Sequence, residues 1–96
     1  LSNSEIFYPT EYSLNQSYPN PFNPIISIPF SVLSYDIVTI KIYDIEGSLV
    51  TTLIEDNYNR GNHIVNWDGS NYSSGSYIVK MDSGDYNSSQ IITLVK

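Results

Sequence analysis

The chain has 96 residues, which suits one domain, because two separate cores would each be too small to close over their apolar surface. Ten acidic residues against four basic ones give a net charge of −6 and a pI near 4.2. Such a surface repels phosphate groups, so nucleic acid and anionic membranes are poor partners. The absence of cysteine excludes disulfides and thiolate chemistry, and no apolar run is long enough for membrane insertion.

The first residues differ in character from the rest. Residues 1–11 are polar and irregular, with Pro9 stopping any regular element, and are interpreted as the end of a linker. The chain starts without an initiator Met or a signal-peptide pattern, so we expect a piece of a longer protein whose catalytic or binding domain lies upstream. One folded domain is expected over residues 12–96.

The apolar residues of this domain indicate β-structure. Ile, Val and nine Tyr dominate, whereas Ala, which helices prefer, is absent. Segments with a two-residue period alternate with turn signals at intervals of roughly 8–12 residues. The pattern predicts an all-β, immunoglobulin-like antiparallel β-sandwich of about seven strands. The expected strands are residues 12–16, 26–32, 38–43, 48–54, 63–67, 77–81 and 90–95.

Alternation along these strands also predicts the core and one irregularity. Pro29 cannot donate a ladder hydrogen bond, so its strand is expected at an edge or with irregular pairing. The side chains expected between the sheets are Ile28, Phe30, Val38, Ile40, Ile42, Val65, Trp67, Tyr77, Val79, Ile92 and Leu94.

The sequence offers little support for catalysis. The single histidine, His63, shares a strand face with Val65 and Trp67 and is interpreted as a partly buried strand residue. Paired acids occur at strand ends or in turns, where Asp satisfies local backbone groups. These pairs are Asp44 with Glu46, Glu55 with Asp56, and Asp82 with Asp85. We therefore expect a protein that is not an enzyme and has no cofactor.

Two binding alternatives stay open. Residues 68–71, Asp-Gly-Ser-Asn, offer oxygen ligands for calcium, although they do not match the spacing of a twelve-residue calcium loop. Tyrosines in loops and at strand ends suit sugar stacking, but also simple half-burial. The alternative function is thus an extracellular immunoglobulin- or fibronectin-like binding or spacer module. The tyrosines in question are Tyr8, Tyr12, Tyr18, Tyr58, Tyr72 and Tyr86.

One segment is not explained by strand patterning. It reads Tyr18-Pro19-Asn20-Pro21-Phe22-Asn23-Pro24. Three prolines fix the backbone and remove three donors, so the segment cannot be a central strand. It is expected to be a stiff crossover, with Phe22 anchoring it on the core.

This string and four later ones resemble the C-terminal sorting domain of type IX secretion cargo, in its YPNPFNP class. The later strings are Lys-Ile-Tyr-Asp-Ile-Glu-Gly at 41–47, Gly-Asn-His-Ile-Val-Asn-Trp-Asp-Gly at 61–69, Ser-Gly-Ser-Tyr at 74–77 and the apolar end with a terminal lysine at 91–96. Immunoglobulin-like domains of flagellar hook-capping proteins are similar in scaffold. The match runs in order over about residues 12–96.

The resemblance implies a non-catalytic signal domain that directs a parent protein across the outer membrane. Its implied partners are the type IX translocon and shuttle components, and a sortase-like peptidase that removes the domain near the preceding linker. The implied route runs through the periplasm to the cell surface or the medium.

Recognition is expected at the YPNPFNP segment and at the last strand, whose free edge could add to a partner's sheet. The candidate recognition residues are Tyr18, Pro19, Asn20, Pro21, Phe22, Asn23, Pro24, Gly47, Leu94, Val95 and Lys96.

Overall fold

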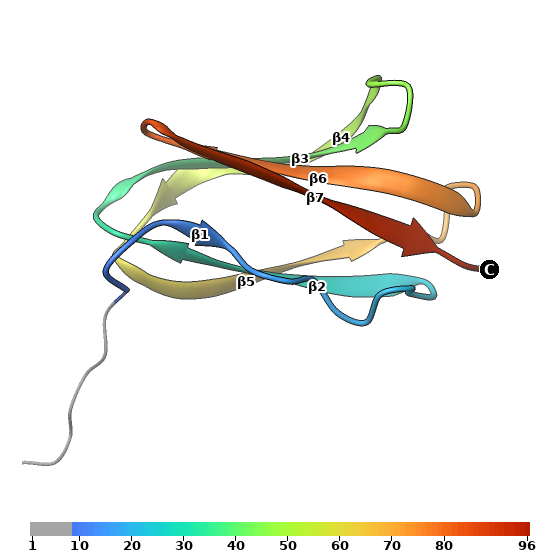
Figure 1. Cartoon of the computed structure of the whole chain (residues 1–96), viewed down its shortest axis with the longest axis horizontal. Helices are drawn as coiled ribbons and strands as arrows, with labels where there is room; N and C mark the ends of the chain where they lie inside the picture. The colour runs from blue at the N-terminus through green and yellow to red at the C-terminus, as the bar shows by residue number, and fades with distance from the viewer. Residues whose placement is uncertain (1–8) are drawn as a thin grey trace, which may run out of the picture.

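Seven strands form the computed structural model, which describes residues 9–96 (Figure 1). Of the expected linker end, residues 1–8 lie outside the described residues, and residues 9–11 belong to no strand. The strands are β1 (Ser13–Leu14), β2 (Ile25–Val32), β3 (Asp36–Asp44), β4 (Leu49–Tyr58), β5 (Gly61–Asp68), β6 (Gly75–Ser83) and β7 (Tyr86–Leu94).

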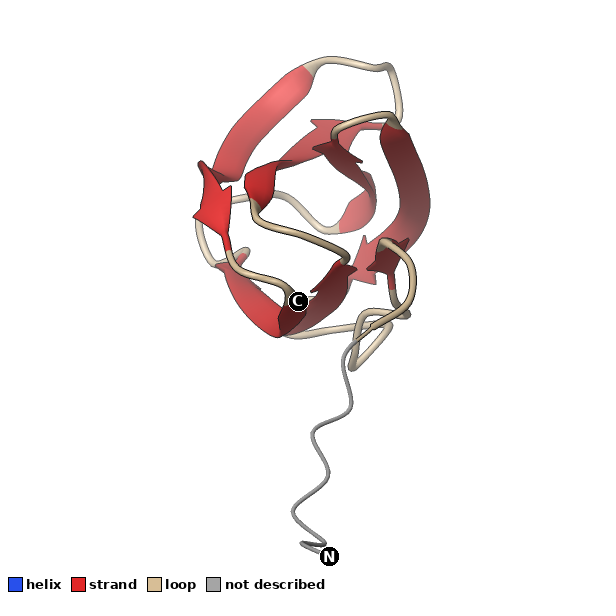
Figure 2. Ribbon diagram, turned by 90° about the vertical axis from the view of Figure 1, so that its left-hand side faces the viewer, coloured by secondary structure: helices blue, strands red, loops and turns tan. Residues whose placement is uncertain are grey.

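The strands divide into two antiparallel sheets that enclose the core, as the end-on view of Figure 2 shows. One sheet has the order β1-β2-β5 and the other the order β4-β3-β6-β7. In the constant type of immunoglobulin domain the fourth strand belongs to the sheet of the first, second and fifth strands; here it pairs with β3 instead. The predicted all-β sandwich of about seven strands is confirmed.

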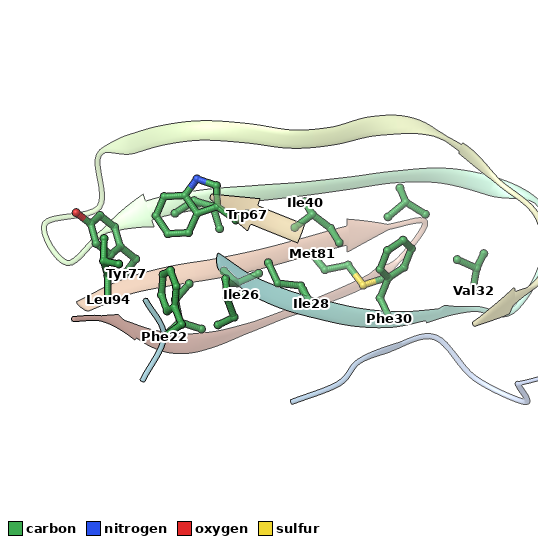
Figure 3. Packing of buried hydrophobic residues seen from close by; sticks show 14 residues of the cluster. Phe22, Ile26, Ile28, Phe30, Val32, Ile40, Trp67, Tyr77, Met81 and Leu94 are labelled. Carbon is green, nitrogen blue, oxygen red and sulfur yellow. The ribbon is translucent and has the colours of Figure 1, made fainter. Parts of the chain in front are cut away.

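The core lies between the sheets and runs along the full length of β2 (Figure 3). Fully burying one such large apolar side chain contributes about 1.5–3 kcal/mol, so this layer supplies most of the stability. Ten of the eleven expected core residues are buried, whereas Val65 is half-buried and only packs against the cluster. The core also contains Phe22, Ile26, Val32 and Met81, which the strand patterns had not included.

Pro29 explains why the β1 side of β2 is paired irregularly, as expected. β2 lies between β1 and β5, so it is not an edge strand. On its β1 side, the carbonyl of Pro29 accepts from the Asn15 amide at 2.9 Å, and the next pairing is an isolated bridge between Tyr18 and Ser27. Strand β1 ends at Leu14, shorter than the predicted 12–16, because no donor of Pro29 could continue the ladder.

The start of β6 is fixed by a tyrosine corner. Tyr77 is 8% exposed, and its hydroxyl donates to the backbone carbonyl of Ser73 at 2.6 Å. Immunoglobulin-like sandwiches use a tyrosine near the start of their sixth strand in this way, to hold the connection from the fifth strand against the core. The ring also packs edge-on against Trp67, with centroids 5.3 Å apart.

We expect Tyr77→Phe to lower the free energy of unfolding by about 1 kcal/mol, because it leaves the Ser73 carbonyl without this donor while keeping the ring. The control is Tyr35→Phe, since Tyr35 is 67% exposed and should leave stability unchanged. Urea denaturation followed by tryptophan fluorescence measures both variants. Equal stability of Tyr77→Phe and the native chain would show that the corner adds nothing.

Candidate recognition site

The YPNPFNP segment lies along the outer edge of β7. The side chain of Asn20 donates from Nδ2 to the Ile91 carbonyl at 3.1 Å and accepts from the Thr93 amide at Oδ1 at 2.9 Å. The backbone of Phe22 donates to the Thr93 carbonyl at 2.8 Å and accepts from the Val95 amide at 2.9 Å. The amide of Asn20 therefore replaces the peptide group of a neighbouring strand, and Phe22 continues the pairing as a parallel bridge.

Side chains of β7 extend this contact toward β1. Gln90 accepts from the Ser17 amide at 2.8 Å and donates to the Asn15 carbonyl at 2.7 Å. The hydroxyl of Tyr86 accepts from the Leu14 amide at 3.0 Å. Together these bonds join residues 14–22 to β7, a contact that we call the seam. It closes the side of the sandwich on which β1 and β7 are the outermost strands of their sheets.

The seam changes the expectation that the last strand has a free edge. Three outward backbone groups of β7, and the amide of Val95 just after it, are already bonded to Asn20 and Phe22. The loop in turn has few donors of its own, because three of its seven residues are prolines. Addition of a partner strand here would first require the loop to leave. The edge is covered, and the covering segment itself is a poor template for further pairing.

We expect Asn20→Ala to expose the edge of β7 locally, because both side-chain hydrogen bonds are lost while the buried Phe22 remains. The amide of Thr93 should exchange with deuterium at least several-fold faster, corresponding to about 1 kcal/mol of lost protection. Hydrogen exchange by NMR measures this rate. Asn23→Ala is the control, because Asn23 is exposed and makes no hydrogen bond to the rest of residues 9–96. Unchanged Thr93 exchange in Asn20→Ala would contradict the seam.

Phe22 joins the loop to the core where three other segments meet. Its ring packs against Trp67 with centroids 5.7 Å apart (Figure 3). Gly69, directly after β5, donates its amide to the Pro24 carbonyl at 2.8 Å. A Cβ at Gly69 would lie 3.0 Å from a methyl group of Leu94 and 3.4 Å from the Phe22 ring. The absence of a side chain at Gly69 thus allows loop, β5 and β7 to approach one another. The predicted anchoring role of Phe22 is confirmed.

Gly47 has a different role, in the turn between β3 and β4. Its φ of +88° is in the left-handed region, and its amide donates to the Asp44 carbonyl at 3.0 Å. The Asp44 carboxylate accepts from the amides of Glu46 and Ser48, each at 2.9 Å. These features define a three-residue hairpin loop in which glycine follows a tight turn. Gly47 is therefore explained by backbone conformation alone.

We expect Gly47→Ala to destabilise the fold by about 1 kcal/mol, because L-residues with a Cβ disfavour this backbone region. Nothing lies within 4 Å of the added Cβ, so the cost is conformational rather than steric. Gly47→Asn should cost less, because Asn tolerates the left-handed region better. Denaturant unfolding of the two variants tests the order, which a steric origin of the effect would reverse.

Parts of all the recognised strings lie at one end of the sandwich, toward the right in Figure 1, whereas Gly61 begins β5 at the other end. Strand pairing requires this, since Leu94 is opposite Gly75, Asp44 is opposite Tyr77, and Phe22 is bridged to Leu94. We call this end the motif pole. It consists of residues 18–24, 44–48, 69–74 and 95–96. Tyr12, where the described chain enters the sandwich, bonds Asp36 at the opposite pole.

The end of the chain is tied to the motif pole by hydrogen bonds. Lys96 donates its amide to the Ser74 hydroxyl at 3.1 Å and its ammonium to the Ser70 carbonyl at 2.6 Å. In the same loop, hydrogen bonds from the hydroxyl and amide of Ser70 lower the pKa of the Asp68 carboxyl below its ordinary value. Of the candidate recognition residues, Phe22 and Leu94 are buried, whereas Tyr18, Val95 and Lys96 are exposed.

Other predicted chemistry finds no assembled site. His63 is half-buried, stacks on Phe30 with centroids 5.4 Å apart and bonds the Asn59 carbonyl at 2.8 Å, as a strand residue would. Asp68 turns its carboxylate to Ser70, and among residues 9–96 no three His, Asp or Glu side chains gather to hold a metal ion. The described part of the chain contains no pocket. It also has no helix that could cross a membrane.

The fold defines an immunoglobulin-like β-sandwich, with the proline-rich segment, the β3–β4 and β5–β6 connections and residues 95–96 gathered at one end. Over residues 16–95 the chain matches the family described as the secretion system C-terminal sorting domain, and it belongs to that family. These domains are signals for type IX secretion, so the chain is a sorting signal whose parent is exported to the cell surface or beyond. No individual curated protein matches the chain.

Proposed function

We propose that this domain acts as a non-catalytic address that the type IX translocon and its shuttle components recognise in the periplasm. The observation that carries the proposal is the family match over residues 16–95. The convergence of the family's strings at one pole supports it, because a single receptor surface could contact them together. The absence of a pocket in residues 9–96 also fits recognition by a surface better than the binding of a small substrate.

Within this proposal, the exposed part of the motif pole is the contact surface. The seam favours recognition of the loop and the chain end as one joint surface, rather than addition of a partner strand to β7. Its exposed members include Tyr18, Asn20, Asn23, Val95 and Lys96. Phe22, Gly47 and Leu94 then act indirectly, because the fold requires them and they hold that surface in shape.

Removal by a sortase-like peptidase, if the parent is released in this way, belongs to the opposite end. Tyr12 lies at the pole opposite the motif pole, so a receptor bound to the motif pole would not cover the point where residues 9–11 join the sandwich. The alternative function, a binding or spacer module for carbohydrate or protein, predicts no dependence on the secretion machinery. The two functions therefore differ in a measurable way.

The test is export of a secreted reporter fused to the 96-residue chain in a bacterium that has the type IX machinery. We expect the reporter in the medium or on the cell surface only when the chain is attached and the translocon is intact. The mass of the exported reporter shows whether the domain has been cut off. Equal export of the reporter with and without the translocon would contradict the proposal and favour a spacer or binding module.

Deletion of residues 95–96 sharpens this test. Removing residues 92–96 would also remove Ile92 and Leu94 from the core, so lost export could simply reflect unfolding. Without Val95 and Lys96 the core stays complete, and we expect a stability loss of only about 1 kcal/mol. Export should nevertheless fall by about tenfold, the effect of losing one strong contact.

The matched control for this deletion is Tyr35→Ser, a change of an exposed side chain in the loop between β2 and β3. It should leave export unchanged. Thermal unfolding of both purified chains confirms that they are folded. If the chain without residues 95–96 is exported like the native fusion, the chain end is not part of the contact surface.

A further inference from the structure

The solvent-facing side of the four-stranded sheet carries an apolar row that crosses all four strands. In register, Leu49 of β4 is opposite Tyr43 of β3, Tyr43 is opposite Ile78 of β6, and Ile78 is opposite Ile91 of β7. Directly paired residues share one face of a sheet, and Tyr43, Ile78 and Ile91 alternate with buried residues of their strands. Leu49 pairs with Tyr43 next to a register shift and is 54% exposed. Four strands at their usual spacing make this row about 14 Å long.

The next row along the same face carries two lysines directly opposite each other. Lys41 of β3 is paired with Lys80 of β6, and their outer neighbours are the short side chains of Thr52 and Ser89. Like charges in directly opposed positions destabilise a sheet. Two of only four basic residues in a chain of net charge −6 are thus concentrated at one point of this face.

Neither lysine has a partner within residues 9–96. The other two basic residues do: Lys96 bonds the Ser70 carbonyl and Arg60 bonds the Pro9 carbonyl. Asp82 and Glu55 occupy the following row, opposite Thr39, yet they form no ion pair with Lys41 or Lys80 in the described structure. The two ammonium groups are the charges that this fold leaves available.

The side chains of residues 41–47 divide into those that build the fold and those that face solvent. Ile42 is buried in the core, and Asp44 and Gly47 build the hairpin turn. Lys41 and Tyr43 point to the opposite side, and the side chain of neither makes a hydrogen bond within residues 9–96. The fold therefore accounts for the first group and leaves the second free for contact.

We propose that this face, the row Leu49-Tyr43-Ile78-Ile91 with the Lys41–Lys80 pair, docks a protein partner that presents a carboxylate beside apolar side chains. A carboxylate between the two lysines removes their repulsion and accepts charge-assisted hydrogen bonds from both. The apolar row buries against the neighbouring side chains of the same partner. The inference rests on the proposed function, in which that partner is a component of the export machinery.

Charge favours a protein over a lipid surface. Two lysines attract an anionic membrane only weakly, while the net charge of −6 opposes the approach of the whole domain. A single acidic side chain on a protein partner matches the lysine pair locally without bringing a negative plane near the other acids. A contiguous exposed apolar row is also typical of protein contact sites.

The experiment uses the reporter fusion described above with Ile91→Ser and Lys80→Gln. Each variant has a matched control on the outer face of the other sheet, Ile64→Ser and Asn66→Asp. Ile91 and Ile64 are 65% and 59% exposed, and Lys80→Gln and Asn66→Asp each shift the net charge by −1. We expect both test variants to reduce export by about tenfold, as loss of an interface anchor does. Lys80→Arg keeps the positive charge and should be exported like the native fusion. The controls should stay within about twofold of the native fusion, as non-contact positions do.

The remaining outcomes overturn the proposal in distinguishable ways. If the native fusion is exported and Ile91→Ser and Lys80→Gln match their controls, the face is not a contact and the sorting function stands. If the native fusion itself is not exported, both proposals fail. If the purified chain binds phosphatidylglycerol vesicles and Lys80→Gln abolishes this binding, the face contacts a membrane instead. If the chain dimerises in sedimentation and Lys80→Gln abolishes the dimer, the face contacts a second copy of the chain. Thermal unfolding verifies that every variant is folded.

Discussion

The seam between residues 14–22 and β7 is the contact on which the rest of this sandwich depends. On that side the outermost strands are β7 and β1, and β1 has only two residues, so the sheets alone would leave the core open. Asn20 and Phe22 supply the hydrogen bonds that a full strand would provide, and the Phe22 ring fills the space beneath. Gly69 then has room only for a hydrogen atom, which brings β5 to the same point.

The seam also gives the proline-rich string a physical meaning. An exposed sheet edge offers unpaired N–H and C=O groups to any other strand, and natural proteins protect such edges with prolines or covering loops. Here one segment combines both means, because it covers β7 and carries prolines at three of its own seven positions. This edge of β7 is therefore protected against the addition of a strand from another chain.

The strand pattern could be predicted from the sequence because alternation is local. The core positions of β2, β3 and β6 followed from it, and so did the irregular pairing at Pro29. The seam could not be predicted, since Asn20 and Thr93 are 73 residues apart and a side-chain amide that imitates a peptide leaves no periodic signal. The half-buried Val65 was misjudged because the alternation of β5 does not show how far each sheet extends beyond the other. The recognition residues themselves stay predictions.

The long sequence separation within the seam makes the motif pole a report on the integrity of the polypeptide. Tyr18 pairs with Ser27 nearby in the sequence, but Asn20 and Phe22 lack their edge partners until residues 91–95 have been synthesised, folded against β6 and brought alongside them. A chain that lacks residues 91–95, or does not fold them against β6, cannot assemble the joint surface, although it still contains the proline-rich string. A receptor that contacted the assembled surface, and not the proline-rich string alone, would bind the folded domain and not its unfolded fragments.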